Sequence, residues 1–98
     1  MLHESKSLRA QGAHIIIVLA HAGLRCDRMR PEPALIRKAN DSEGSCDAHD
    51  EIPDLLAALP KGTIDAVIAG HTHQIVHHYL HGIPVIQAGA NGLYYNLL

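Results

Sequence analysis

The sequence of 98 residues contains no phenylalanine or tryptophan and three tyrosines. Few aromatic side chains leave few surfaces on which nucleic-acid bases can stack. Lysine and arginine number 8 against 10 aspartates and glutamates, a formal net charge of −2 with neutral histidines. A nucleic-acid interface needs an excess of basic side chains to neutralise phosphates, so the composition argues against nucleic-acid binding.

Long apolar runs are also missing. No stretch approaches the roughly 20 apolar residues that cross a bilayer, so the sequence predicts no membrane span. The amino-terminal residues MLHESKSLRAQG lack the apolar segment of a secretory signal, and by themselves they indicate a cytoplasmic chain. We expect at most one small domain, which buries roughly 65% of its unfolded-chain surface.

Histidine is plentiful, with nine residues, and two of them follow an apolar run in Ile64–Gln74, IDAVIAGHTHQ. The run 64–69 predicts a strand buried on both faces. Gly70 is expected to turn the chain at positive φ. In extended backbone, the imidazoles of His71 and His73 would then lie on the same side. The carboxyl edge of an α/β sheet is where ligand sites usually form, so this spacing indicates metal binding.

The elements around this stretch predict an α/β fold. Residues 14–20 predict a strand buried on both faces and followed directly by His21. Residues 50–59 predict a helix from their apolar spacing, with Asp50 as the N-cap. With strand 64–69 they form a βαβ unit, whose parallel strands bring His21 and the later histidines to one edge.

Other elements lie at the two ends of the chain. Residues 2–11 predict a helix that Gly12 ends. A hairpin of 75–80 and 83–88 is expected to turn at His81 and Gly82, with Pro84 indicating an edge position or a gap in pairing. The last residues, GANGLYYNLL, resemble the start of another strand.

A polar, turn-rich insert occupies about residues 22–47, and Cys26 and Cys46 lie near its ends. A disulfide between them would close about twenty residues, which contributes roughly 3 kcal/mol on a chain-entropy argument. It would also require an oxidising compartment. Two free thiols are the alternative, and the residues alone leave the two readings about even.

Three motifs together resemble a known family: IIIVLAHAG over Ile15–Gly23, the later GHTH, and HGIPVIQAGANG. In order and spacing they are similar to the calcineurin-like metallophosphoesterases, specifically the 5'-nucleotidase branch. The resemblance covers about Leu8 to Asn91. It implies that 1–98 is the carboxyl-terminal portion of an α/β/β/α sandwich. Some exported members carry a similar cysteine pair, which favours the disulfide, and because the family is often periplasmic or extracellular the compartment stays open.

The resemblance also implies a dinuclear metal site. It gives His21 and His71 to one divalent ion and His73 to the other, with Mn, Zn, Fe, Ni or Mg as the candidate metals. His78 would lie beside the site, and Asn91 and Gly92 would border the substrate, although a tight turn explains the last two equally well. The implied reaction is hydrolysis of nucleotide phosphomonoesters by metal-activated water. The remaining histidines are expected at solvent or helix-end positions: His3, His14, His49, His77 and His81.

The chain departs from the family pattern in one large respect. The Asp-x-His, Gly-Asp and Gly-Asn-His motifs, which supply the bridging carboxylate and the catalytic histidine, are missing. The acidic residues available as substitutes are Asp47, Asp50, Asp54 and Asp65, and Asp65 lies at the start of its strand, away from the histidines. We therefore expect part of a site. The alternative is a non-catalytic metal-binding fragment, or the partner half of a split enzyme, which pairs with an amino-terminal half or self-associates.

Overall fold

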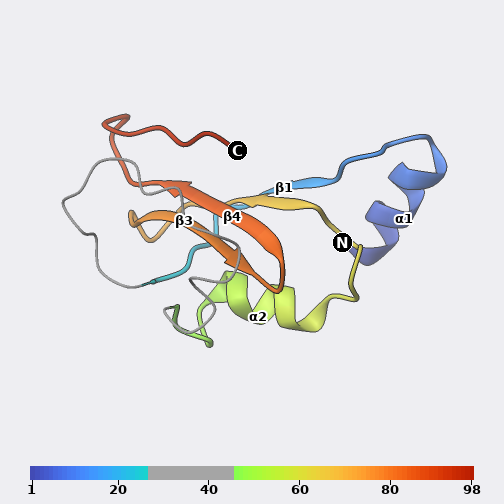
Figure 1. The fold of residues 1–98 in the computed structure, drawn as a ribbon, viewed down its shortest axis with the longest axis horizontal. Helices are drawn as coiled ribbons and strands as arrows, with labels where there is room; N and C mark the ends of the chain where they lie inside the picture. Colours follow the sequence, from blue (N-terminus) through green and yellow to red (C-terminus); the bar gives the residue numbers. More distant parts are fainter. Residues whose placement is uncertain (27–45) are drawn as a thin grey trace.

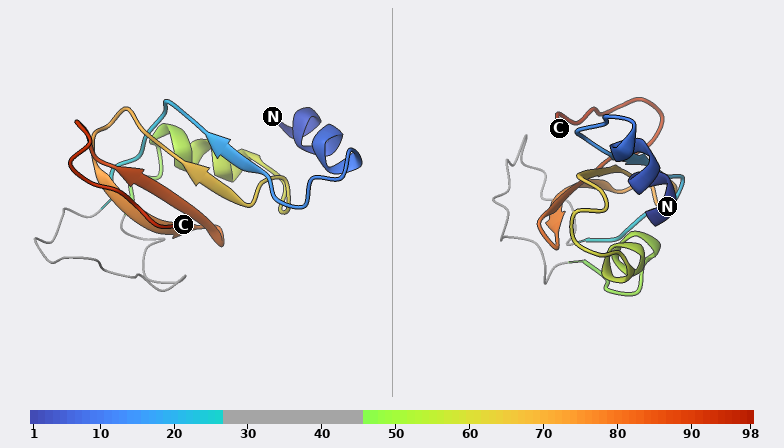
Figure 2. Two further views of the ribbon diagram at one scale, coloured as in Figure 1. Left: turned by 90° about the horizontal axis from the view of Figure 1, so that it is seen from above. Right: turned by 90° about the vertical axis from the view of Figure 1, so that its right-hand side faces the viewer.

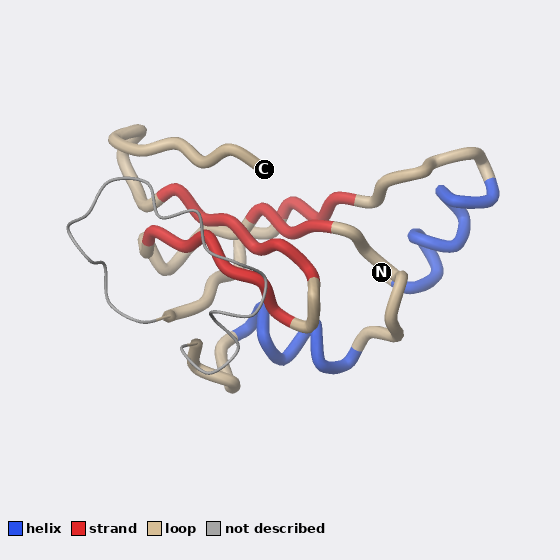
Figure 3. The backbone as a smooth tube through the Cα atoms, viewed as in Figure 1, coloured by secondary structure: helices blue, strands red, loops and turns tan. Residues whose placement is uncertain are grey.

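The structure is a computed structural model and describes residues 1–26 and 46–98, so most of the insert expected at 22–47 lies outside the described residues. Within these described residues, two helices and a four-stranded sheet form a mixed α/β fold, in agreement with the predicted class (Figure 1; Figure 3). Strands β1, β2 and β4 are parallel, and β3 is antiparallel to β4, in the order β1-β2-β4-β3. The elements are α1 (Leu2–Ala10), β1 (Ile17–Leu19), α2 (Glu51–Ala58), β2 (Ala66–Ile68), β3 (Ile75–Leu80) and β4 (Ile83–Ala88).

The core lies between the sheet and α2, which covers one face (Figure 2). Ile52 and Leu56, one turn apart on α2, are buried with Val67 of β2 and Val85 of β4. Burying each such side chain contributes about 1.5–3 kcal/mol. Among residues 1–26 and 46–98, no helix combines the length and apolar character that a membrane crossing requires.

Strand β1 is shorter than expected, and the prediction that it is buried on both faces is wrong. Ile16 is 8% exposed, whereas Ile15, Ile17 and Leu19 are 68%, 46% and 76% exposed. Successive side chains of a strand point to opposite faces, so one set packs into the core and the other faces outward. Ile68 of β2, at 37% exposure, pairs in register with Leu19. The outward side chains of Ile15, Ile17, Leu19 and Ile68 are called the open apolar face below.

The hairpin has the predicted bounds. His81 and Gly82 at its turn have φ of 52° and 78°, and two positive values suit the type I′ turn that matches strand twist. Of the two alternatives predicted for Pro84, the edge position is wrong, because β4 lies between β2 and β3, and the gap in pairing is confirmed. Pairing of β4 with β2 covers Val85 and Ile86, so the missing N–H of Pro84 lies outside that ladder.

The carboxyl-terminal segment does not form the expected strand. Asn91 and Gly92 form a turn with φ of 61° and 66°, and residues 93–98 contain no strand. This segment lies on the opposite side of the sheet from α2 (Figures 1 and 2). The Asn96 side-chain amide donates to the carbonyl of Val76 at 3.4 Å, which ties the segment to β3.

Helix α1 is attached near the amino-terminal ends of β1 and β2. It ends before Gly12, whose φ of 102° agrees with the predicted helix stop. Arg9 of α1 forms a 2.7 Å ion pair with Asp65, and the same carboxylate oxygen accepts a 2.7 Å hydrogen bond from the backbone N–H of Ile16. The hydrogen bond from the Ile16 N–H lowers the pKa of Asp65 below its ordinary value of 3.8. The Arg9 guanidinium is the second cause of this shift in pKa.

Replacing Asp65 with asparagine is expected to destabilise the fold in a pH-dependent way. Because the folded-state pKa is lowered, the carboxylate contributes stability above pH 3.8, and this contribution is lost as pH falls below that value. Urea unfolding of both proteins at several pH values checks this. The gap in unfolding free energy between wild type and Asp65→Asn should be full at neutral pH and shrink below pH 3.8. A gap that stays constant over the whole range would contradict the assigned role.

Candidate metal centre

Two histidines from different strand ends meet at the carboxyl edge of the sheet. His21 follows β1 and His71 follows β2, which lie side by side and run parallel. The Nε2 atom of His21 and the Nδ1 atom of His71 are 3.2 Å apart. Their rings meet edge to face, with centroids 5.0 Å apart and an interplanar angle of 62°. The two side chains are exposed, and they lie together as the parallel topology predicted.

The separation of these nitrogens fits ligation of one metal ion. Two imidazole nitrogens on a tetrahedral zinc ion, each at about 2.0–2.1 Å, lie about 3.3 Å apart. Ligation requires both facing nitrogens to be deprotonated, which places the ring protons of His21 on Nδ1 and of His71 on Nε2. Without a metal, a shared proton makes the same contact an N–H···N hydrogen bond.

The turn that carries His71 differs from the predicted one. Gly70 is not in the left-handed region, whereas His71 has φ of 73° and His73 has φ of 57°. The Thr72 N–H donates to the Gly70 carbonyl at 2.9 Å. A two-residue hydrogen bond around a central φ near +75° is the strained form of the γ-turn. The prediction of extended backbone at His71 and His73 is therefore wrong. His71, the central residue of the turn, carries the strain.

Strain of this kind has a recognisable cost. A non-glycine residue in such a conformation costs about 1–3 kcal/mol and persists only where its surroundings hold it. Strained residues of this type cluster at functional sites, so the backbone conformation of His71 supports a functional role for its side chain.

The described residues do not bring a third ligand to this pair. In the part of the chain that the structure describes, the only trio of His, Cys, Asp or Glu ligand atoms within 4.8 Å of one another is Cys26, Cys46 and His78. His73 is exposed and outside any such trio, so its assignment to a second ion stays a prediction.

The acidic residues considered as replacements have other roles or positions. Asp50 is the N-cap residue of α2, but its carboxylate pairs with Arg25 at 2.7 Å and makes no cap hydrogen bond. Asp65 pairs with Arg9 at the other end of β2, and Asp47 accepts from the His49 N–H at 3.0 Å. Asp54 is exposed on α2. None of them joins the His21–His71 pair within 4.8 Å.

A buried hydrogen-bond network, which the sequence reasoning missed, holds the turn that carries the histidines. The Thr72 hydroxyl donates to the Leu24 carbonyl at 3.0 Å and accepts from the Gln87 amide at 2.8 Å. Gln87 also donates to the Gln74 carbonyl at 3.0 Å and is 1% exposed. The glutamine in the otherwise apolar strand IPVIQA was a signal for this network, because a buried side-chain amide needs hydrogen-bond partners.

The loop after His21 packs directly on this turn through Gly23. The Gly70 N–H donates to the Ala22 carbonyl at 3.0 Å, and the Gly23 N–H donates to the Glu51 carboxylate at 3.0 Å. A Cβ atom on Gly23 would lie 2.5 Å from both the Gly70 oxygen and the Thr72 methyl group. Glycine is therefore the residue that lets the two histidine loops approach each other.

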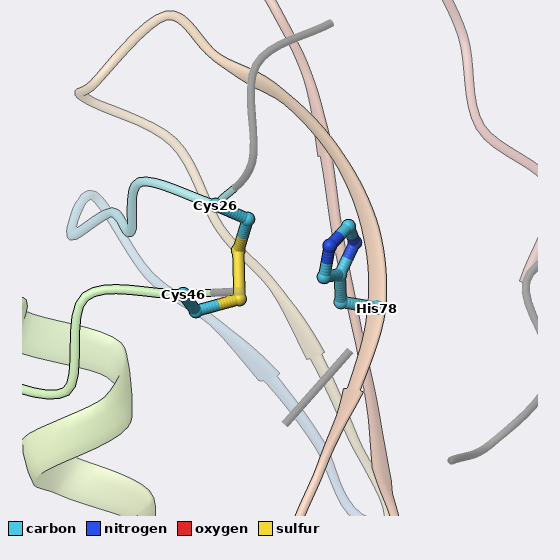
Figure 4. A group of neighbouring side chains, drawn as sticks. All are labelled: Cys26, Cys46 and His78. Atoms are coloured by element: carbon cyan, nitrogen blue, oxygen red, sulfur yellow. A yellow bond between two sulfur atoms is a disulfide. The ribbon is translucent and has the colours of Figure 1, made fainter. Parts of the chain in front are cut away.

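The other predicted site residues lie elsewhere. Cys26 and Cys46 form a disulfide, one of the two states that the sequence left open. His78 on β3 is 3% exposed and faces this disulfide (Figure 4). Asn91 and Gly92 are exposed in their turn, and a role beside a substrate stays a prediction for both.

Comparisons of the chain with protein-family models, curated proteins and solved structures found no match. The family likeness therefore rests on the motifs alone. The observation from which a function can be argued is the close approach of His21 and His71 at the strand ends.

Proposed function

We propose that this chain supplies part of the metal site of a phosphohydrolase of the calcineurin-like metallophosphoesterase kind, in the 5'-nucleotidase branch. The observation that supports it best is the 3.2 Å separation of the His21 and His71 nitrogens at the ends of adjacent parallel strands. The motifs around both histidines resemble those of that family. The substrates proposed are phosphomonoesters of nucleotides.

The roles of the histidines follow from their chemistry. His21 and His71 would hold one divalent ion and His73 would contribute to a second. Neutral imidazoles add no negative charge, so they leave the ion's positive charge for an anionic substrate. Bound divalent ions supply charge that stabilises a phosphoryl group and lower the pKa of bound water. The exposure of His21 and His71 leaves room for a phosphate to approach.

A second function, as one half of a split site, is favoured by the open apolar face. In the proposed α/β/β/α sandwich, a second sheet would pack on this side of the strands. Leu19, at 76% exposure, is a large apolar side chain that such a layer would cover. The carboxylates that complete a dinuclear site would then come from an amino-terminal half, and the isolated chain would bind metal without catalysis.

Hydrolysis of a chromogenic phosphate ester tests the proposal. The purified chain with added Mn²⁺ is compared with His71→Ala, and activity is expected to disappear in the variant. Activity in the wild-type chain alone favours the complete enzyme over the split site. Hydrolysis absent from both proteins favours the half-site. Equal hydrolysis by both would contradict the role of His71.

A further inference from the structure

A second group of metal-binding side chains lies away from the His21–His71 pair. The sulfur atoms of Cys26 and Cys46 and a ring nitrogen of His78 all lie within 4.8 Å of one another. Figure 4 shows the imidazole beside the disulfide. We propose that, when the disulfide is reduced, these three side chains bind a zinc-type divalent ion.

The distances suit such a site after small movements. Two thiolates on one tetrahedral zinc ion lie about 3.8 Å apart, and a thiolate and an imidazole nitrogen about 3.6 Å apart. The His78 nitrogen lies within 4.8 Å of both sulfurs, so it has to approach them by little more than about 1 Å, whereas the two sulfurs have to move apart once their bond is reduced. The Asp47 N–H donates to the Arg25 carbonyl at 2.8 Å, so a backbone hydrogen bond between the residues next to Cys46 and Cys26 holds the two segments together without the disulfide.

Disulfide and metal exclude each other. Bonded sulfur atoms are about 2.05 Å apart, too close for both to ligate one ion. Opening the bridge requires two electrons and two protons, which an external dithiol supplies while it forms its own disulfide. The two thiols of Cys26 and Cys46 then release their protons to solvent as both sulfurs bind the metal. The site is therefore available in the reduced state alone.

The surroundings favour a bound cation over two bare thiolates. His78 is buried on β3, and the two half-buried cysteines pack against the apolar core. Unpaired charge is costly in such a place, whereas one divalent ion cancels the charge of two thiolates. Thiolates select zinc over Mg²⁺ and Mn²⁺, so the ion expected here is a soft, zinc-type one.

The position of the site gives the bound ion a structural consequence. Cys26 follows the loop after His21, and Cys46 precedes α2. The disulfide ties these two segments together in the oxidised protein. A metal held by the same cysteines would restore the tie under reducing conditions, so the melting temperature of the reduced chain should rise when zinc is added.

Cobalt spectroscopy on the full chain tests the proposal. The protein is reduced with a phosphine, which adds no competing thiol, and titrated with Co²⁺ without oxygen. We expect a near-ultraviolet thiolate-to-cobalt charge-transfer band, which the His21–His71 pair cannot give, that saturates as Co²⁺ is added and disappears when Zn²⁺ is added. The oxidised protein should show no band. A reduced wild-type chain without the band would overturn the proposal.

Variants of β3 separate ligation from folding. His78→Ala is expected to weaken Co²⁺ binding at least about 10-fold, whereas His77→Ala, its neighbour on the same strand, should bind as wild type does. His78→Cys keeps a ligand and should retain the band even if the alanine variant is poorly folded. Wild-type affinity in a folded His78→Ala would refute the role of His78. His71→Ala should keep the band, so this result is independent of the proposed hydrolase function.

Discussion

Replacing His71 with alanine is expected to lower the affinity of the oxidised chain for Zn²⁺ or Mn²⁺ by at least about 100-fold. Loss of a mere hydrogen-bond partner of a metal ligand already costs about 10–100-fold in affinity, and His71 is proposed as a ligand itself. Its Nδ1 atom lies 3.2 Å from His21 Nε2, so one imidazole left alone forms a much weaker site. Calorimetric titration of the oxidised protein measures the change, because the disulfide keeps Cys26 and Cys46 from binding metal.

Two control variants make this result specific. His81→Ala removes an exposed imidazole from the hairpin turn and should leave affinity nearly unchanged. His71→Gly removes the same ligand but allows the positive φ of 73° without strain. It should therefore lose metal binding while gaining about 1 kcal/mol of stability over His71→Ala. Equal binding by wild type and both His71 variants would mean that the two rings share only a hydrogen bond.

The approach of His21 and His71 was predictable because it follows from topology. Two apolar runs separated by a helix predict parallel neighbours, and the residues that follow such strands must meet at one edge. The hairpin was predictable for a similar reason, since its turn and strand alternation are local. These features depend on patterns that short segments of sequence carry by themselves.

The turn conformation was not predictable, because distant contacts decide it. Local preference assigns positive φ to Gly70, yet the structure assigns it to His71 and His73. The contacts that hold this turn come from Leu24 and from Gln87 on β4, far away in sequence. The exposure of one side of β1 was not predicted for a related reason. The sequence of a strand shows how apolar its residues are, but it does not show which other elements pack against them.

Replacing Gly23 with alanine is expected to disrupt the fold and the histidine pair together. The added methyl would lie 2.5 Å from the Gly70 carbonyl oxygen and 2.5 Å from Thr72 Cγ2, so two segments would have to move apart. Overpacking of this kind costs about 1–3 kcal/mol. We expect a value near the upper end, because the contact with Gly70 is with backbone, which yields less easily than a side chain. Urea unfolding of the variant measures the loss.

Gly70→Ala is the matched control, because Gly70 is the glycine whose carbonyl group packs against Gly23. A Cβ there would meet only the Ala20 carbonyl at 3.7 Å, an ordinary contact, and the φ of Gly70 is outside the left-handed region. This variant should therefore keep its stability or gain about 0.4–1 kcal/mol, through lower entropy of the unfolded chain. Metal affinity should fall in Gly23→Ala, because its methyl separates the loops that carry His21 and His71, and should persist in Gly70→Ala. Equal losses in the two variants would show that general glycine flexibility, rather than close packing at Gly23, brings the histidines together.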